Sequence, residues 1–119
     1  SLFCSGAMVS TCLETAINLE KFKISCSVIN MHTIKPVDIE VIKDESVKSK
    51  LIVSVEEHNI IGGLGSAISE ELSKLDNHPK MIRIGINDQY TKGGSYNFLK
   101  DKYELTPDKI SEKIKLNLG

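Results

Sequence analysis

Apolar residues along this chain alternate between the two-residue spacing of strands and the three-to-four-residue spacing of helices. Strands are predicted at Leu2–Cys4, Ile24–Met31, Leu51–Val55 and Met81–Ile86. Helices are predicted at Met8–Phe22, at Val37–Asp44 and from Leu64 to Leu75, with two short helices after residue 95. Strands that alternate with helices are typical of a sheet covered on both faces. The pattern therefore predicts an α/β fold, a three-layer sandwich with a mainly parallel sheet of about four or five strands.

Two of the predicted strands are nearly continuous apolar runs. Leu51–Val55 is rich in β-branched residues, which favours a central, parallel position in the sheet. The other, Ile24–Met31, becomes fully apolar at Val28 and Ile29. We therefore expect it to enter the centre of the sheet as well.

The first and last predicted helices each carry an apolar stripe. In the first helix the expected buried residues are Val9, Cys12, Leu13, Ala16 and Ile17. The last helix follows Thr106-Pro107-Asp108, a capping residue with Pro at the first helical position. Its expected buried residues are Ile110, Ile114 and Leu118. Between these two helices, a short helix is predicted to carry Tyr96, Leu99 and Tyr103 on one stripe.

The composition is that of an ordinary globular protein: 119 residues, 40% hydrophobic and 26% charged. Lys and Arg number 15 and Asp and Glu number 16, so the formal charge is −1. A nucleic-acid-binding domain normally has a basic excess, so nucleic-acid binding is not expected. Neither a membrane-spanning stretch nor a basic leader is present, and we expect a soluble, cytoplasmic protein. The length predicts one domain, residues 1–119, which is a fragment or a small part of a larger enzyme.

The three cysteines match no redox, zinc or disulfide pattern. Cys4, Cys12 and Cys26 are an odd number, and no C-x-x-C motif occurs among them. We interpret them as small buried apolar residues in a reducing compartment.

The segment from Leu51 to Ala67 is the strongest candidate for function, because a strand, acidic residues and three glycines lead into a helix. Ligands and partner surfaces collect at the carboxyl ends of parallel strands, where helix N-termini point free N–H groups outward. The candidate interface or anion-binding loop consists of Glu57, His58, Gly62, Gly63, Gly65 and Ser66. The alternative is that the glycines only let the chain turn and the helix pack closely.

No complete active site is found, and no catalytic residue is assigned. The dinucleotide fingerprint fails because Ile68 stands where its third glycine belongs. The three histidines, His32, His58 and His78, do not have metal-ligand spacing. Adjacent in sequence, Glu56 and Glu57 would point to opposite faces of a strand and could not act as an acid–base pair.

Two blocks of sequence resemble the C-terminal domain of transketolases. They are INMHTIKPVD (residues 29–38) and VSVEEHNIIGGLGSA (residues 53–67), and the match continues through RIGIND (83–88) and YELTP (103–107). It covers the chain from Leu2 to Leu118, and residues 58–61 look closest to transketolases divided into two polypeptides. Deoxyxylulose-phosphate synthases and 2-oxoacid dehydrogenase β subunits belong to the same superfamily. Residues 87–92 depart from the family pattern.

The resemblance implies a thiamine-diphosphate-dependent enzyme with Mg2+ that moves two-carbon ketol units between sugar phosphates. In such enzymes the cofactor lies between pyrophosphate-binding and pyrimidine-binding domains, and the C-terminal domain lies outside that contact. This chain would then bind no cofactor or metal itself, be inactive alone, dock on those domains and brace a homodimer. The alternatives are a stand-alone module or a regulatory domain that binds a nucleotide or phosphate at Gly62–Ser66.

Overall fold

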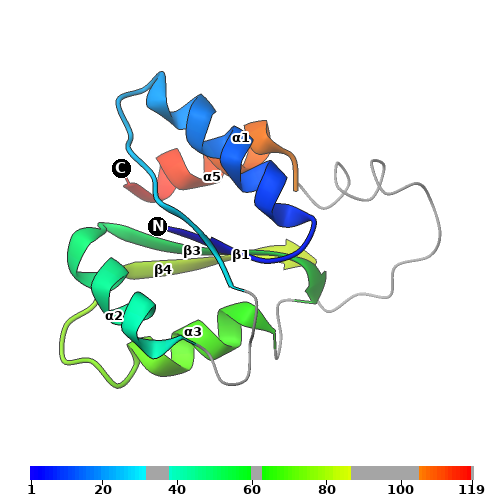
Figure 1. The fold of residues 1–119 in the computed structure, drawn as a ribbon. Helices are drawn as coiled ribbons and strands as arrows, with labels where there is room; N and C mark the ends of the chain where they lie inside the picture. Colours follow the sequence, from blue (N-terminus) through cyan, green and yellow to red (C-terminus); the bar gives the residue numbers. More distant parts are fainter. Residues whose placement is uncertain (32–37, 60–62, 87–104, 119) are drawn as a thin grey trace.

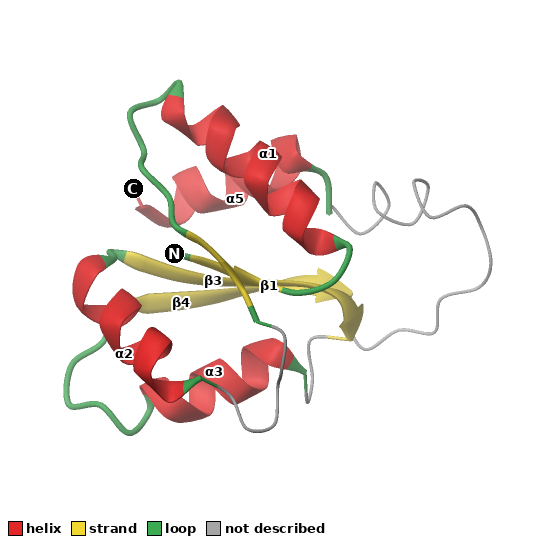
Figure 2. Cartoon of the chain, viewed as in Figure 1, coloured by secondary structure: helices red, strands yellow, loops and turns green. Residues whose placement is uncertain are grey.

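Four parallel strands in the order β2-β1-β3-β4 form a sheet with helices on both faces (Figures 1 and 2). The computed structural model describes residues 1–31, 38–59, 63–86 and 105–118. Their elements are β1 (Leu2–Cys4), α1 (Met8–Glu20), β2 (Val28–Asn30), α2 (Ile39–Lys48), β3 (Leu51–Asn59), α3 (Leu64–Leu72), β4 (Lys80–Ile86) and α5 (Pro107–Leu118). The predicted three-layer α/β sandwich with a parallel sheet is confirmed, with four strands among the described residues.

Two apolar cores lie on opposite faces of the sheet, because successive side chains of a strand alternate between faces. One core joins α1 and α5 to Leu2, Cys4, Val53 and Val55. The other joins α2 and α3 to Phe3 and Ile52. Figure 1 shows this division, with α1 and α5 above the sheet and α2 and α3 below it. Both central strands are therefore apolar on both faces, as their continuous sequence pattern requires.

The prediction of a central position was correct for β3 and wrong for the strand that begins at Ile24. Strand β3 pairs with both β1 and β4. Strand β2 is an edge strand, and it contains only Val28–Asn30. Its Val28 packs against one core and its Ile29 against the other. The apolar run therefore reflects coverage by helices on both faces and does not indicate a central position.

Strand β3 is longer than predicted and continues through Asn59. Val55 pairs with Ile84, whereas Asn59 pairs with Ile86, so the register shifts between these two pairs. Such an irregularity bends a strand and re-aims its side chains, and it is common next to functional sites. The first residues of the candidate loop, Glu57 and His58, therefore belong to a strand.

The buried face of α1 differs from the predicted stripe. Its buried residues are Met8, Thr11, Cys12, Thr15 and Leu19. Leu13 and Ile17 are 51% and 60% exposed. The apolar spacing predicted the wrong face because it counts threonine as a polar residue. Threonine can be buried in a helix when its hydroxyl donates to a carbonyl of the preceding turn. Thr15 does so, since its Oγ1 donates to the Thr11 carbonyl at 2.8 Å.

The other helices begin within two residues of their predicted starts, but α2 runs four residues beyond its predicted end and α3 stops three residues before its own. Helix α2 is continuous to Lys48 and is capped by Asp38, whose carboxylate accepts a hydrogen bond from the Val41 N–H at 3.2 Å. Helix α5 starts at Pro107 as expected and buries Ile110 and Ile114, but Leu118 is 39% exposed. The predicted helix of Tyr96, Leu99 and Tyr103 lies outside the described residues.

Replacement of Leu19 and Ile17 tests the orientation of α1. Leu19→Ala is expected to lower the free energy of unfolding by about 2–4 kcal/mol, because Leu19 is fully buried in the core. Ile17→Ala is the matched control and should change it by less than about 1 kcal/mol. Urea unfolding of both variants checks this, and equal losses would contradict the observed orientation.

Candidate functional site

The candidate site lies where β3 ends and α3 begins, at the carboxyl edge of the sheet (Figure 1). Glu57 and His58 lie near the end of β3. Gly63 directly precedes α3, and Gly65 and Ser66 lie in the first turn of that helix. Gly62 and the side chains of residues 57–59 lie outside the described part of the structure. The fold therefore brings the backbone of the described members of this set, Glu57, His58, Gly63, Gly65 and Ser66, to one edge of the sheet.

Glu56 holds the first turn of α3. Its side chain is 6% exposed, and its two carboxylate oxygens accept hydrogen bonds from the Leu64 N–H at 2.5 Å and the Gly65 N–H at 3.0 Å. Gly63, at the N-cap position, supplies no side-chain cap. A carboxylate at a helix N-terminus satisfies free N–H groups and interacts favourably with the helix dipole. Glu56 thus performs the capping role from eight residues upstream.

This contact bears directly on the anion-binding hypothesis. An anion at a helix N-terminus is bound by the free backbone N–H groups of the first turn. In α3 two of these groups, those of Leu64 and Gly65, already donate to Glu56. A phosphate bound there would have to displace a buried carboxylate or overcome its repulsion, which disfavours a phosphate site at this position.

Gly65 is required by close packing between α3 and the sheet. A Cβ at this position would lie 2.6 Å from Ser54 Oγ, and 3.1 and 3.2 Å from Arg83 Cδ and Cγ. Ser54 is fully buried on β3, and its hydroxyl has no hydrogen-bond partner among the described residues. The side chain of Arg83 crosses from β4 and donates from Nη1 to Ser66 Oγ at 3.2 Å. The structure thus supports the packing explanation for Gly65.

Sequence analysis did not predict three contacts at this edge of the sheet. They are the hydrogen bonds from α3 to Glu56, the packing of Gly65 against Ser54, and the packing of the Arg83 side chain against Gly65 and Ser66. One sequence feature could have pointed to Glu56. Helix α3 begins Gly-Leu-Gly without a Ser, Thr, Asp or Asn at its start, so its N–H groups need an acceptor from elsewhere. Glu56 also continues the two-residue alternation of Ile52 and Ser54 toward the same face.

The described residues were searched for groups that could bind a metal ion or act as a nucleophile. Within ranges 1–31, 38–59, 63–86 and 105–118, no three His, Cys, Asp or Glu side chains are grouped so that they could hold a metal ion. All three cysteines are free; Cys4 and Cys12 are fully buried as expected, while Cys26 is half-buried. Burial raises the pKa of the Cys26 thiol, which opposes a nucleophilic role. Among the described helices, none is both long and apolar enough to cross a membrane.

The chain matches the sequence profile of the family described as transketolase, C-terminal domain, over residues 1–110. It therefore belongs to this family, as the sequence blocks indicated. It is 37% identical over 115 residues to a provisionally named transketolase C-terminal section from Methanocaldococcus jannaschii, covering 96% of this chain and 35% of that protein. It is also 41% identical over 106 residues to the 1-deoxy-D-xylulose-5-phosphate synthase of Heliobacterium modesticaldum, covering 89% and 16%.

A solved structure has the same fold. It is that of a split-gene transketolase in an inactive beta4 tetramer, with a TM-score of 0.88 and 33% sequence identity. The match covers 98% of this chain and 38% of that one. This chain thus spans about a third or less of the length of these relatives, and in them the shared fold is one part of a larger polypeptide.

Glu56→Gln is expected to lower the free energy of unfolding by about 2 kcal/mol. The amide retains one oxygen acceptor but loses the charge, and it turns an N–H donor toward the N–H groups of α3. Chemical denaturation measures the loss. Glu70→Gln is the matched control, because Glu70 lies in α3, the helix that Glu56 caps, but its side chain is exposed, so the change should cost under about 1 kcal/mol. Equal effects of the two changes would contradict the cap.

Gly65→Ala should destabilise the protein by about 1–3 kcal/mol, because the added methyl group meets Ser54 Oγ and the Arg83 stem. In an unobstructed helix the same change stabilises by up to about 1 kcal/mol, so the sign of the effect is informative. Removing the obstructing hydroxyl with Ser54→Ala should recover part of the loss. A double-mutant cycle on the free energy of unfolding measures this coupling, and strict additivity would argue against the contact.

Proposed function

We propose that this chain is the C-terminal domain of a thiamine-diphosphate-dependent, transketolase-type transferase. The larger enzyme would move two-carbon ketol units between sugar phosphates in the cytoplasm. The chain would dock on the pyrophosphate-binding and pyrimidine-binding domains of that enzyme and brace its homodimer, without catalysing the reaction itself. What supports this proposal is the match to the family along nearly the whole chain, with relatives that continue far beyond it.

The observation that carries the docking role is the contact of Glu56 with α3. Because this carboxylate takes up two N–H groups of the helix, the surface at the carboxyl edge is suited to packing against another protein surface more than to holding an anion. The buried contact also ties β3 at Glu56 to the start of α3. The alternative of a nucleotide or phosphate at Gly62–Ser66 gains no support from this geometry.

Thiamine diphosphate and Mg2+ belong to the proposed enzyme and not to the residues described in this chain. Those residues provide no group of three ligands for a divalent ion, and the helix N-terminus at the candidate site faces a carboxylate of its own chain. The described residues therefore do not fit the cofactor, and no catalytic step is assigned to them. That the domain binds no cofactor stays a prediction.

Replacing His58 and Gly63 in the assembled enzyme tests the docking role. The double variant His58→Ala, Gly63→Val is expected to weaken association with the other domains or subunits, and to lower turnover by about tenfold through the loss of interface contacts. Analytical ultracentrifugation measures association, and a coupled assay measures turnover. His78→Ala is the control, because His78 is an exposed histidine outside the candidate loop whose ring bonds the neighbouring Pro79 carbonyl.

Three results would count against the docking role. One is a double variant that associates and turns over like the unmodified enzyme. The other is a movement of the Leu64 and Gly65 amide resonances when ATP or NAD+ is added to the unmodified protein, which would favour the nucleotide alternative instead. An equal loss in His78→Ala would indicate a general effect on folding and would also remove the assignment.

A further inference from the structure

Cys4 and Cys12 are in contact inside the core between β1 and α1. Cys4 is the last residue of β1, and Cys12 lies in the second turn of α1. Both side chains are fully buried, and they belong to the same apolar core. Their thiols are hydrogen-bonded to each other, and the Cys4 thiol also donates to the Ile29 carbonyl at 3.7 Å. The fold thus turns two cysteines that match no sequence motif into a dithiol pair.

The two thiols of this pair are not equivalent. The hydrogen bond from Cys12 lowers the pKa of the Cys4 thiol, because it stabilises the Cys4 thiolate against the opposing effect of burial. The same bond raises the pKa of the Cys12 thiol, and burial raises it further, so Cys12 keeps its proton. Cysteines that respond to oxidants are often paired in this way, with one nucleophilic sulfur and a second cysteine that resolves the first product.

The start of α1 gives a route to these buried thiols. Residues 5–7 form the turn that joins β1 to α1, and Gly6 and Ala7 are exposed. Ala7, at the N-cap position, makes no side-chain cap hydrogen bond. A helix end without a capping side chain is less stable than a capped one, and weakly held ends open locally without unfolding of the whole protein. Opening of the first turn of α1 would expose both thiols together.

We propose that Cys4 and Cys12 form a redox site in the folded protein, where a hydroperoxide oxidises the dithiol to an intrachain disulfide. First, the Cys4 thiolate attacks one oxygen of the hydroperoxide, and the O–O bond breaks. The other oxygen leaves as water or an alcohol, with the proton that Cys4 gave up. The Cys12 sulfur then attacks the Cys4 sulfenic acid, the S–O bond breaks, and water leaves with the Cys12 proton. Each sulfur loses one electron, and the two oxygens of the hydroperoxide gain them.

This inference is independent of the docking role, because neither cysteine belongs to the Glu57–Ser66 segment. The interpretation of the cysteines as buried apolar residues in a reducing compartment describes the reduced form of the pair. Oxidation would add a reversible covalent link between the end of β1 and α1, which a thiol reductant removes.

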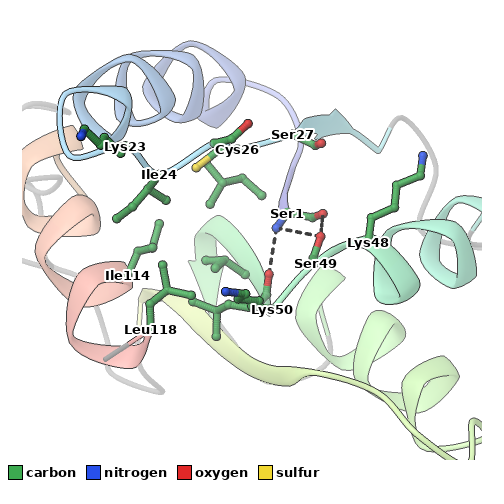
Figure 3. Close-up of a pocket in the computed structure, with 14 residues that line it drawn as sticks. Ser1, Lys23, Ile24, Cys26, Ser27, Lys48, Ser49, Lys50, Ile114 and Leu118 are labelled. Carbon is green, nitrogen blue, oxygen red and sulfur yellow. Dashed lines mark hydrogen bonds between the residues drawn. The ribbon is translucent and has the colours of Figure 1, made fainter.

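Cys26 is the reference thiol within the same chain. It lies in the segment before β2, where it lines a cavity between the starts of β1 and β3 (Figure 3). It is half-buried, and burial raises the pKa of its thiol. Trypsin separates it from the pair, because Cys4 and Cys12 lie in one peptide that ends at Lys21, whereas Cys26 lies in the peptide that begins at Ile24. If exposure alone governed oxidation, Cys26 would react first.

The test treats the full chain with hydrogen peroxide, blocks the remaining thiols with N-ethylmaleimide in acidic urea, and follows both peptides by mass spectrometry. The peptide of Cys4 and Cys12 is expected to become lighter by two hydrogen atoms and to bind no maleimide, and dithiothreitol should reverse this change. Cys26 should lose its thiol about fivefold more slowly or less, because it lacks a partner thiol. Loss of the Cys26 thiol at the same rate or faster would overturn the proposal, as would the absence of a disulfide in the pair.

Replacing each cysteine separates the two steps of the reaction. In Cys12→Ala the hydrogen bond to Cys4 is lost, so oxidation of Cys4 should slow about fivefold or more and end at a sulfenic acid that dimedone traps. In Cys4→Ala, Cys12 should stay reduced over the same period. Cys26→Ala is the matched control and should leave the rate of disulfide formation within about twofold. Oxidation of Cys4 at an unchanged rate without Cys12, or of Cys12 without Cys4, would contradict the assigned roles.

A variant in the other core distinguishes local opening from global unfolding. Leu72→Ala removes a buried side chain on the opposite face of the sheet, which should raise the unfolded fraction about thirtyfold or more. Oxidation through local opening of α1 should keep its rate within about threefold. A rate that rises in proportion to the unfolded fraction would show that the pair reacts only in the unfolded chain, and the proposed site in the folded protein would be wrong.

Discussion

Strand β3 is the constraint on which the rest of the structure depends. It pairs with a parallel strand on each side and is covered by helices on each face. Val53 and Val55 belong to the core under α1 and α5, and Ile52 belongs to the core under α2 and α3. A shift of this strand by one residue would exchange the two sets of side chains, so its register sets the positions of both helical layers.

The same alternation decides what happens where β3 ends. After Ile52, the next two side chains on the α3 face are Ser54 and Glu56, one small and one charged. Ser54 leaves room for the close approach of Gly65, and Glu56 supplies the acceptor that the first turn of α3 lacks. The glycines that first suggested a ligand loop are thereby accounted for in part by packing and by an internal cap. A buried carboxylate is stable there because its oxygens are hydrogen-bonded at a positive helix end.

The two edges of the sheet differ in electrostatic character. At the carboxyl edge the carboxylate of Glu56 accepts hydrogen bonds from two N–H groups of α3. At the amino edge, the described residues that line a cavity between the starts of β1 and β3 include three lysines and no Asp or Glu. A net charge of −1 for the whole chain conceals this difference, because composition records the number of charges but not where the fold places them. The two edges of the sheet therefore differ in the charges that the fold gathers at them.

The sequence by itself determined the fold class, the family and the central place of β3. These follow from local periodicity, from capping residues such as Thr106, and from continuous blocks of sequence, all of which are readable along the chain. Only the tertiary structure decided which face of α1 is buried, that β2 lies at the sheet edge, and that Glu56 caps a helix eight residues away. It also decided that Lys23 lies near Lys48 and Lys50, more than twenty residues further along the chain, at the amino edge of the sheet. Each of these depends on contacts between residues distant in sequence, and hydrophobic periodicity carries no information about which partner a face or a charged group will meet.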